Sequence, residues 1–242
     1  MSNHNWRGPA RVSVKLLPIR LPTMNAVTAA SPPLTQKRRA RGRPACSASV
    51  GADVLLRSAR RTFAKQGFDA SSVREIAREA GVDPALIAHH FGSKEALWMA
   101  VVEQIGQRTA GLVESTAALR STELGARERV EHALAFFIDR VFDEPDIGMF
   151  FSTAATEEGE RLHVLIERLV RPYHDVFVPL LQDAGAAGEM KPGDAEVMFQ
   201  MLMNAVSKTV AYSHVLQAFS SLPEDQTRFK RAVLVTAVGM LG

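Results

Sequence analysis

Residues 72–91 constrain the fold of this chain more than any other stretch, because they carry start and stop signals for two short helices. Ser72 is followed three residues later by Glu75, the pattern of a capping box. In a capping box the hydroxyl accepts a backbone N–H of the first turn and the glutamate reaches back to the cap. Gly81 then ends the helix, since glycine enters the left-handed conformation without steric cost. The pattern predicts a first short helix followed by a tight turn.

A second short helix begins directly after this turn. Asp83 is a suitable N-cap, and Pro84 fits the first turn because its missing N–H would have no partner there. Helical spacing predicts that Leu86, Ile87 and Phe91 face inward. Two short helices joined by a glycine-containing turn are typical of a helix-turn-helix, whose second helix enters the major groove of DNA. The residues expected to face outward are Ala85, Ala88, His89 and His90.

A longer stretch, residues 55–102, resembles the DNA-binding domain of the TetR (TetR/AcrR) family of bacterial transcriptional regulators. The resemblance implies a three-helix DNA-binding domain over residues 49–97. One position departs from the family pattern, since Ala88 stands where a tyrosine or another large residue is usual. The matching residues are Ala59, Phe63, Gly67 and Phe68, followed by residues 72–77, 80–82 and 90–97.

Two regions are candidates for DNA contacts. Directly after the motif, Lys94 follows the capping residue Ser93, and a helix N-terminus with a lysine suits a phosphate. His90 is at a position that commonly contacts phosphate in the resembled family. Upstream, the basic run 37–44 is interpreted as an arm that follows phosphates or enters the minor groove, with a solvated tail as the alternative. The candidate DNA-binding residues are Arg39, Arg41, Arg43, Ser72, Val82, Asp83, Pro84, Ala85, His89, His90 and Lys94.

The N-terminal residues 1–48 are expected to form a disordered basic extension, because they are rich in Pro, Ala and Ser and show no sustained periodicity. Residues 1–50 contain nine Lys or Arg and no acidic residue, whereas the remainder has 20 basic and 26 acidic residues. The single cysteine, Cys46, excludes an intrachain disulfide and suits a reducing cytoplasm. No apolar run reaches the roughly 20 residues of a membrane span. The protein is therefore expected in the cytoplasm, associated with the nucleoid.

The chain after this extension shows helical periodicity, and no strand-like alternation appears anywhere, which predicts an all-α fold. Prolines interrupt the pattern at Pro172 and Pro179, where a helix is expected to kink or divide. The chain is divided into the extension, the DNA-binding domain and a helical bundle over residues 98–242. The expected helices outside the motif cover residues 52–66, 94–116, 125–143, 147–157, 161–183, 194–219 and 224–241.

The resemblance implies that the second half is a ligand-binding and dimerisation bundle. A homodimer through the last two helices is expected because these carry more apolar side chains than one core face uses. The alternative for those side chains is an internal core. A pocket for a small apolar or aromatic effector needs an apolar wall with a few polar groups. The candidate ligand-binding residues are Phe137, Met149, Phe150, His163, Tyr173, Phe177 and Asn204.

An enzyme is not expected. Glu160 and His163 form one Glu-x-x-His pair, and a di-iron bundle needs two such pairs with two further glutamates. His89 and His90 point to different faces of a helix and cannot share a metal. No Cys-x-x-Cys, nucleophile elbow or phosphate loop occurs, so neither a metal nor a cofactor is expected. The sequence thus predicts a ligand-responsive repressor that binds a palindromic operator as a homodimer. The alternative is a helical protein that binds small molecules but no operator.

Overall fold

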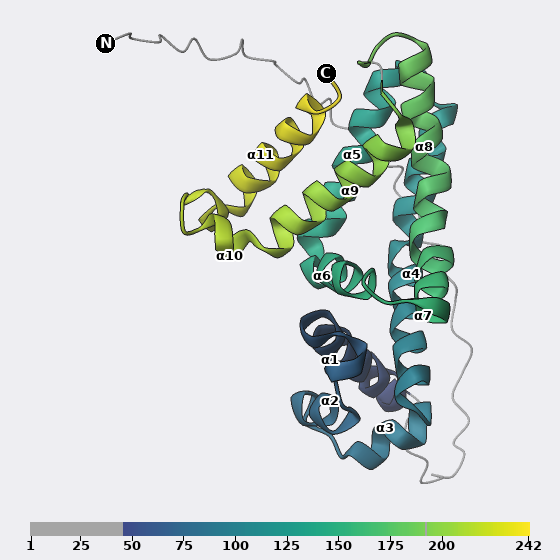
Figure 1. Ribbon diagram of the computed structural model, residues 1–242, viewed down its shortest axis with the longest axis vertical. Helices are drawn as coiled ribbons and strands as arrows, with labels where there is room; N and C mark the ends of the chain where they lie inside the picture. Colours follow the sequence, from purple (N-terminus) through teal and green to yellow (C-terminus); the bar gives the residue numbers. More distant parts are fainter. Residues whose placement is uncertain (1–45, 192) are drawn as a thin grey trace, which may run out of the picture. The chain divides into compact units, whose positions relative to one another are not determined.

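The computed structural model describes residues 46–191 and 193–242, with side chains from Ala52 onward (Figure 1). Within these ranges the ordered elements are all helical and no strand occurs, which confirms the predicted all-α fold. The basic run with Arg39, Arg41 and Arg43 lies outside the described residues. No helix in the described ranges combines the length and the apolar character that crossing a membrane would need.

The first four helices follow the predicted order. Helix α1 is Cys46–Ala70, but Gly67 has φ 80° and ψ 174°, so the regular helix ends just before it, as expected. Helices α2 (Val73–Ala80) and α3 (Pro84–Phe91) form the helix-turn-helix. Helix α4 (Lys94–Ala118) then runs on into the second half of the chain, where it packs beside α5 and α8 (Figure 1).

The second half begins with a 3-10 turn, Leu119–Ser121, and contains the helices α5 (Ala126–Asp143), α6 (Pro145–Ala154), α7 (Gly159–Leu165) and α8 (Arg171–Ala186). It ends with α9 (Ala195–Ala211), α10 (Ser213–Leu216), a 3-10 turn Leu222–Glu224 and α11 (Gln226–Gly239). The single helix expected over residues 194–219 is therefore wrong in one respect. Tyr212 leaves the helical conformation and separates α9 from α10.

A π-helical segment, Ile166–Val170, joins α7 to α8 into one continuous helical stretch. Pro172 is the physical reason for the irregular turn, because it has no N–H to donate to the carbonyl of Arg168 four residues earlier. That carbonyl faces Gly106 of α4, where an added Cβ would lie 3.5 Å from it. The predicted disturbance at Pro172 is confirmed as this segment, whereas Pro179 lies inside the continuous α8.

Two hydrophobic cores hold the described chain together. The first lies between α1, α2, α3 and α4, and it also takes in Phe150 from α6 and Leu165 from α7. Trp98 is 2% exposed within it and stacks near Phe150, with 6.1 Å between the ring centroids. The second core lies between α5, α8, α9 and α11. A domain boundary at residue 97 stays a prediction, and the first core extends past it to Ile105.

The prediction that Leu86 faces inward on α3 was wrong. Leu86 is 38% exposed, whereas Ile87 is 1% exposed. Ile87 and Phe91 are four residues apart and therefore share the face toward α2 and α4, while Leu86 lies about 100° away around the helix. A helix of this length buries only one narrow stripe here, and Leu86 falls outside it.

Candidate DNA-binding surface and ligand pocket

The turn between α2 and α3 is fixed by local hydrogen bonds. Gly81 adopts the left-handed conformation, with φ 68° and ψ 34°. The N–H of Val82 donates to the carbonyl of Ala77 at 3.0 Å, which closes the end of α2. Asp83 caps α3 by accepting the N–H of Ala85 at 2.7 Å. These contacts fix the local conformation of the turn between the two helices.

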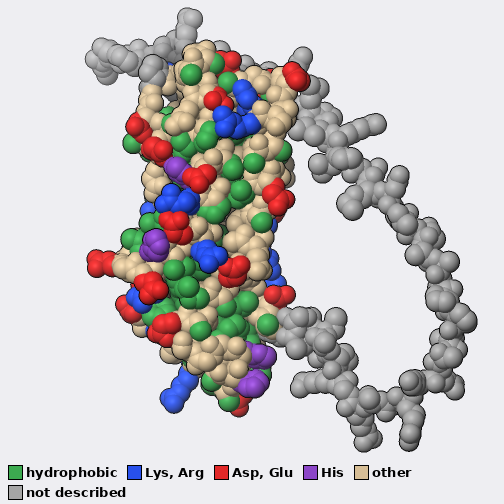
Figure 2. Space-filling view, turned by 90° about the vertical axis from the view of Figure 1, so that its right-hand side faces the viewer, with side chains coloured by type: hydrophobic (Ala, Val, Ile, Leu, Met, Phe, Trp, Pro, Cys, Tyr) green, Lys and Arg blue, Asp and Glu red, His purple; other side chains and the backbone are tan. Residues whose placement is uncertain are grey.

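The outer side of α3 is free of packing. Six of its eight residues are exposed, and only Ile87 is buried. Histidine side chains reach the surface at the end of the molecule that carries α2 and α3 (Figure 2). The face is otherwise short and apolar, so it can approach another surface closely. The exposed residues are Pro84, Ala85, Leu86, Ala88, His89 and His90.

Helix α2 contributes two residues that the sequence analysis did not include in the site. Arg74 and Arg78 are exposed, and Arg78 lies 3.8 Å from Glu75. The sequence could have indicated these two arginines, because the first helix of a helix-turn-helix crosses the DNA backbone. The N-cap half of the capping box is present, with Ser72 Oγ accepting the N–H of Glu75 at 3.2 Å. The Glu75 carboxylate instead accepts a hydrogen bond from Gln66 at 2.7 Å.

Lys94 has a structural role that was not expected. Its ammonium group donates to the carbonyls of Phe68 at 2.8 Å and Ser71 at 3.1 Å, and it lies 4.2 Å from the centre of the Phe68 ring. The charge thereby satisfies carbonyls at the end of α1. A phosphate contact at this position remains a prediction, and the N-terminal N–H groups of α4 are available for it. Ser93 caps that end by accepting the N–H of Ala96 at 3.0 Å.

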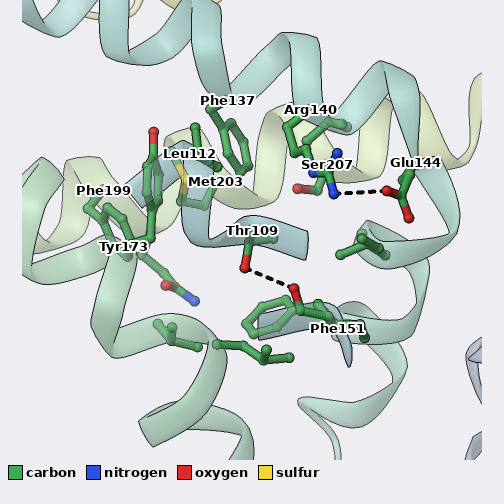
Figure 3. A pocket seen from close by; sticks show the side chains of 17 residues that line it. Thr109, Leu112, Phe137, Arg140, Glu144, Phe151, Tyr173, Phe199, Met203 and Ser207 are labelled. Atoms are coloured by element: carbon green, nitrogen blue, oxygen red, sulfur yellow. Dashed lines mark hydrogen bonds and ion pairs between the residues drawn. The ribbon is translucent and has the colours of Figure 1, made fainter. Parts of the chain in front are cut away.

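A cavity of about 120 Å³ lies within the helical bundle, with apolar walls and a few polar groups (Figure 3). Tyr173 and Phe199 lie at one end of it, and Arg140, Ser207 and Glu144 lie toward the other, where Phe151 is also found (Figure 3). Tyr173 donates its hydroxyl to the carbonyl of Ala133 at 3.2 Å, and burial raises the pKa of this phenol. The lining residues are Ile105, Thr109, Leu112, Phe137, Arg140, Val141, Glu144, Ile147, Gly148, Phe151, Leu169, Val170, Tyr173, Phe199, Gln200, Met203 and Ser207.

The structure brings two of the seven predicted ligand residues to this cavity, Phe137 and Tyr173. Phe177 is fully buried in the second core, while His163 is exposed to solvent. Asn204 donates its side-chain amide to the carbonyl of Gln200 at 2.9 Å instead of lining the cavity. These three residues do not form part of the pocket wall.

Met149 and Phe150 were also expected in the pocket, and they pack in the first core instead. The reason is the rotation of α6. Its two faces contact different parts of the molecule, so Phe150 points toward Trp98 while the adjacent Phe151 lines the cavity. Apolar character alone does not distinguish the two phenylalanines.

Glu144 stands at the polar end of the cavity and contacts three arginines. Its carboxylate lies 3.0 Å from Arg60, 3.0 Å from Arg108 and 2.8 Å from Arg140. Burial, the largest influence, opposes ionisation, but the three guanidinium groups together hold the pKa of Glu144 below its usual value. Glu144 therefore stays ionised at neutral pH. Spacing in the sequence is consistent with the Arg140–Glu144 pair, which is four residues apart, but it gave no indication that Arg60 and Arg108 join it.

Helix α6 connects the cavity to α1. Asp146 near its start accepts two contacts from Arg60 of α1 on a single carboxylate oxygen, at 2.9 and 3.0 Å. Thr153 near its end donates to the carbonyl of Ala64 of α1 at 2.8 Å. On the opposite side, Gly148 approaches α9 so closely that an added Cβ would lie 3.2 Å from the Cβ of Ser207. Helix α6 therefore contacts α1 and also forms part of the cavity wall.

In the described part of the chain, no three His, Cys, Asp or Glu side chains are grouped closely enough to hold a metal ion.

The chain is similar to known proteins both in sequence and in fold. The family of bacterial regulatory proteins of the tetR type matches residues 55–101. The HTH-type transcriptional regulator BetI of Rhizobium meliloti is 31% identical over 177 residues, which cover 71% of this chain and 85% of BetI. The crystal structure of the hemolysin II transcriptional regulator HlyIIR has a TM-score of 0.58 at 17% identity, covering 80% of this chain and 97% of HlyIIR.

The transcriptional regulator FadR of Bacillus subtilis, solved in complex with stearoyl-CoA, has a TM-score of 0.56 at 18% identity, with 78% of this chain and 99% of FadR covered. The two solved structures establish the fold, and BetI extends the likeness in sequence well beyond the helix-turn-helix. The chain belongs to the TetR family of bacterial transcriptional regulators.

Proposed function

We propose that this regulator binds a palindromic operator as a homodimer, represses transcription there, and is released by a small effector held in the bundle cavity. The observation that carries the proposal is the outer face of α3. It is exposed over most of its length, yet its caps and Ile87 hold it rigidly to α2 and α4. A rigid, unpacked helix on a helix-turn-helix is the element that enters the major groove.

The proposed contacts divide into two kinds. Ala85 and His89 face the base edges, with Leu86 available for the methyl group of thymine. Arg74, His90 and the N-terminal N–H groups of α4 contact phosphates. Ser72, Val82, Asp83 and Pro84 set the position of α3, and the basic run with Arg39, Arg41 and Arg43 adds an arm along the DNA.

The homodimer is proposed to form through α9 and α11. Most of the apolar side chains on these helices are buried or partly buried, including Phe199, Leu202 and Phe229. Three large apolar residues nevertheless remain more than half exposed: Val197 and Met201 on α9 and Val235 on α11. A symmetric four-helix contact would remove these side chains from water. The resulting dimer would place two copies of α3 on one operator.

Helix α6 is the proposed connection between effector and DNA. It lines the cavity with Ile147, Gly148 and Phe151, and it contacts α1 through Asp146 and Thr153. An effector needs to favour the DNA-free arrangement by only about 1.4 kcal/mol to weaken operator binding tenfold. A solved relative of the same fold holds stearoyl-CoA, which supports a ligand in this bundle. As a DNA-binding regulator the protein would act in the cytoplasm, at the nucleoid.

The test is a titration of the purified protein on fluorescent DNA from its own upstream region, at several salt concentrations. We expect binding that weakens steeply with salt. H89A should change which bases are preferred, whereas H214A, an exposed histidine on α10, should leave binding unchanged. Absence of salt-dependent binding to any upstream fragment would refute the repressor proposal.

A second candidate function is a small-molecule-binding protein without an operator. It is favoured by the composition of α3, which contains no Lys, Arg, Asn or Gln, the side chains that most often read bases. The same titration decides between the two, because this alternative predicts ligand binding with no specific DNA complex.

A further inference from the structure

The polar end of the cavity carries an excess of positive charge. Arg140 and Glu144 line it, and Glu144 also contacts Arg60 and Arg108. Arg60 in turn pairs with Asp146. Counting only the arginines that contact Glu144, three guanidinium groups face two carboxylates, which leaves one positive charge in excess among the described residues of this cluster. A cationic ligand would be repelled there, whereas a monoanion would complete the pairing.

Arg140 also has a free donor. One of its terminal nitrogens contacts Glu144 at 2.8 Å, but Nε is buried and has no hydrogen-bond partner among the described residues. A buried donor without a partner is costly, and an acceptor supplied by a ligand would remove that cost. In Figure 3 the Arg140 side chain extends over the cavity beside Ser207, whose hydroxyl is a second polar group at this end.

The rest of the wall is apolar. Leu112, Phe137, Phe151, Phe199 and Met203 form part of it (Figure 3). The cavity of about 120 Å³ is slightly smaller than an apolar cavity of roughly 150 Å³ that holds a benzene ring. A single ring or a short alkyl chain therefore fits with small side-chain movements, and Met203 can adapt because its side chain is unbranched.

We propose that this cavity binds small amphipathic carboxylates, with the carboxylate accepting from Arg140 Nε and the hydrocarbon body among the aromatic residues of the wall. The inference rests on the proposed function in one respect, that the cavity is the effector site. The bound carboxylate shares Arg140 with Glu144, which also contacts Arg60 of α1. The ligand therefore acts on the ion pairs that join the cavity wall to the helix-turn-helix core.

The experiment compares ligands that differ only in the head group, using the full-length protein without DNA. Isothermal titration calorimetry with phenylacetate, phenylacetamide and 2-phenylethylamine measures the effect of charge on one apolar body. Hexanoate, hexanamide and hexylamine repeat the comparison on an alkyl chain. We expect at least one acid to bind about tenfold or more tightly than its amide, and neither amine to bind measurably.

Three variants test the assignment to Arg140. R140Q should abolish the preference for acid over amide while amide affinity changes by less than about threefold, and R140K, which keeps the charge but not Nε, should retain part of the preference. R120Q removes an exposed arginine that pairs with Asp183 at 3.4 Å, and it should keep the full preference. Thermal unfolding confirms that each variant is folded.

Equal binding of acid and amide, tighter binding of an amine, an unchanged preference in R140Q, or no binding of any of the six compounds would each overturn the proposal. Operator binding is measured separately on protein without ligand. If the protein binds the acid but no operator, only the proposed function is refuted. If it binds the operator but no acid, only the proposed ligand class is refuted.

Discussion

Arg60 offers the sharpest test of the link between α1 and α6. Its side chain is 4% exposed and contacts Glu144 at 3.0 Å and Asp146 at 2.9 Å. The variant R60M keeps most of the volume and removes the charge. Removing one partner of a buried ion pair costs about 3–5 kcal/mol, because the other charge stays buried.

The lower end of that range applies here. Glu144 keeps Arg108 and Arg140, whereas Asp146 keeps only Arg61 at 4.0 Å and is 22% exposed. We therefore expect R60M to lose about 3 kcal/mol of unfolding free energy. For a chain of this size each kcal/mol lowers Tm by about 2–4 °C. The expected fall in Tm is about 6–12 °C.

The matched control is R61M, in the same helix and against the same carboxylate. Arg61 is 61% exposed and 4.0 Å from Asp146, so its removal should cost less than about 1 kcal/mol. Both variants are compared with the wild type by urea unfolding at one protein concentration, since a dimer's stability depends on concentration. Equal losses in R60M and R61M, or a loss under about 1 kcal/mol in R60M, would show that this ion pair does not hold α6 to α1.

Three further predictions concern charged groups. K94M should lose about 2 kcal/mol in urea unfolding, because two carbonyls near the end of α1 lose their charged donor; wild-type stability would contradict that role. The pKa of Glu144 is lowered in the folded protein, so its stabilisation is present above its unfolded value of about 4.3 and is lost as the pH falls further. E144Q should therefore be less stable at pH 7 and lose less stability between pH 5 and 3, and parallel curves would exclude this. Hydrogen bonding to Asp175, opposed by burial and aided by Glu196, raises the pKa of His174. Its stabilisation is complete below about pH 6.5 and is lost as the pH rises through the folded value. H174Q should differ from wild type more at pH 6 than at pH 9, and the opposite order would refute the assignment.

The helix-turn-helix was predictable because its signals act locally. Ser72, Gly81 and Asp83 each satisfy a backbone group within five residues, so their roles can be read from spacing alone. The burial of Ile87 beside the exposed Leu86 was less predictable. Both are aliphatic and adjacent, and which one is buried depends on the angle at which α3 meets its neighbours.

The pocket was largely not predictable, because its residues come from helices that are distant in the sequence. Phe150 and Phe151 have the same side chain. The packing of α6 between α1 and α9 places Phe150 in the first core and Phe151 in the cavity wall. Arg60 and Glu144 belong to different predicted domains, and no periodicity connects them. The role of Lys94 depends in the same way on a contact with the end of α1 that spacing does not reveal.

The π-helical segment Ile166–Val170 sets a limit on how this chain can change during evolution. Leu165 on one side of it packs in the first core, and Tyr173 on the other side lines the cavity. Deleting one residue between them would turn every later side chain by about 100° around the helix axis and move it by about 1.5 Å. Tyr173 and Phe177 would then leave their positions together. The number of residues in this segment is therefore constrained, because one continuous helical stretch packs in both cores.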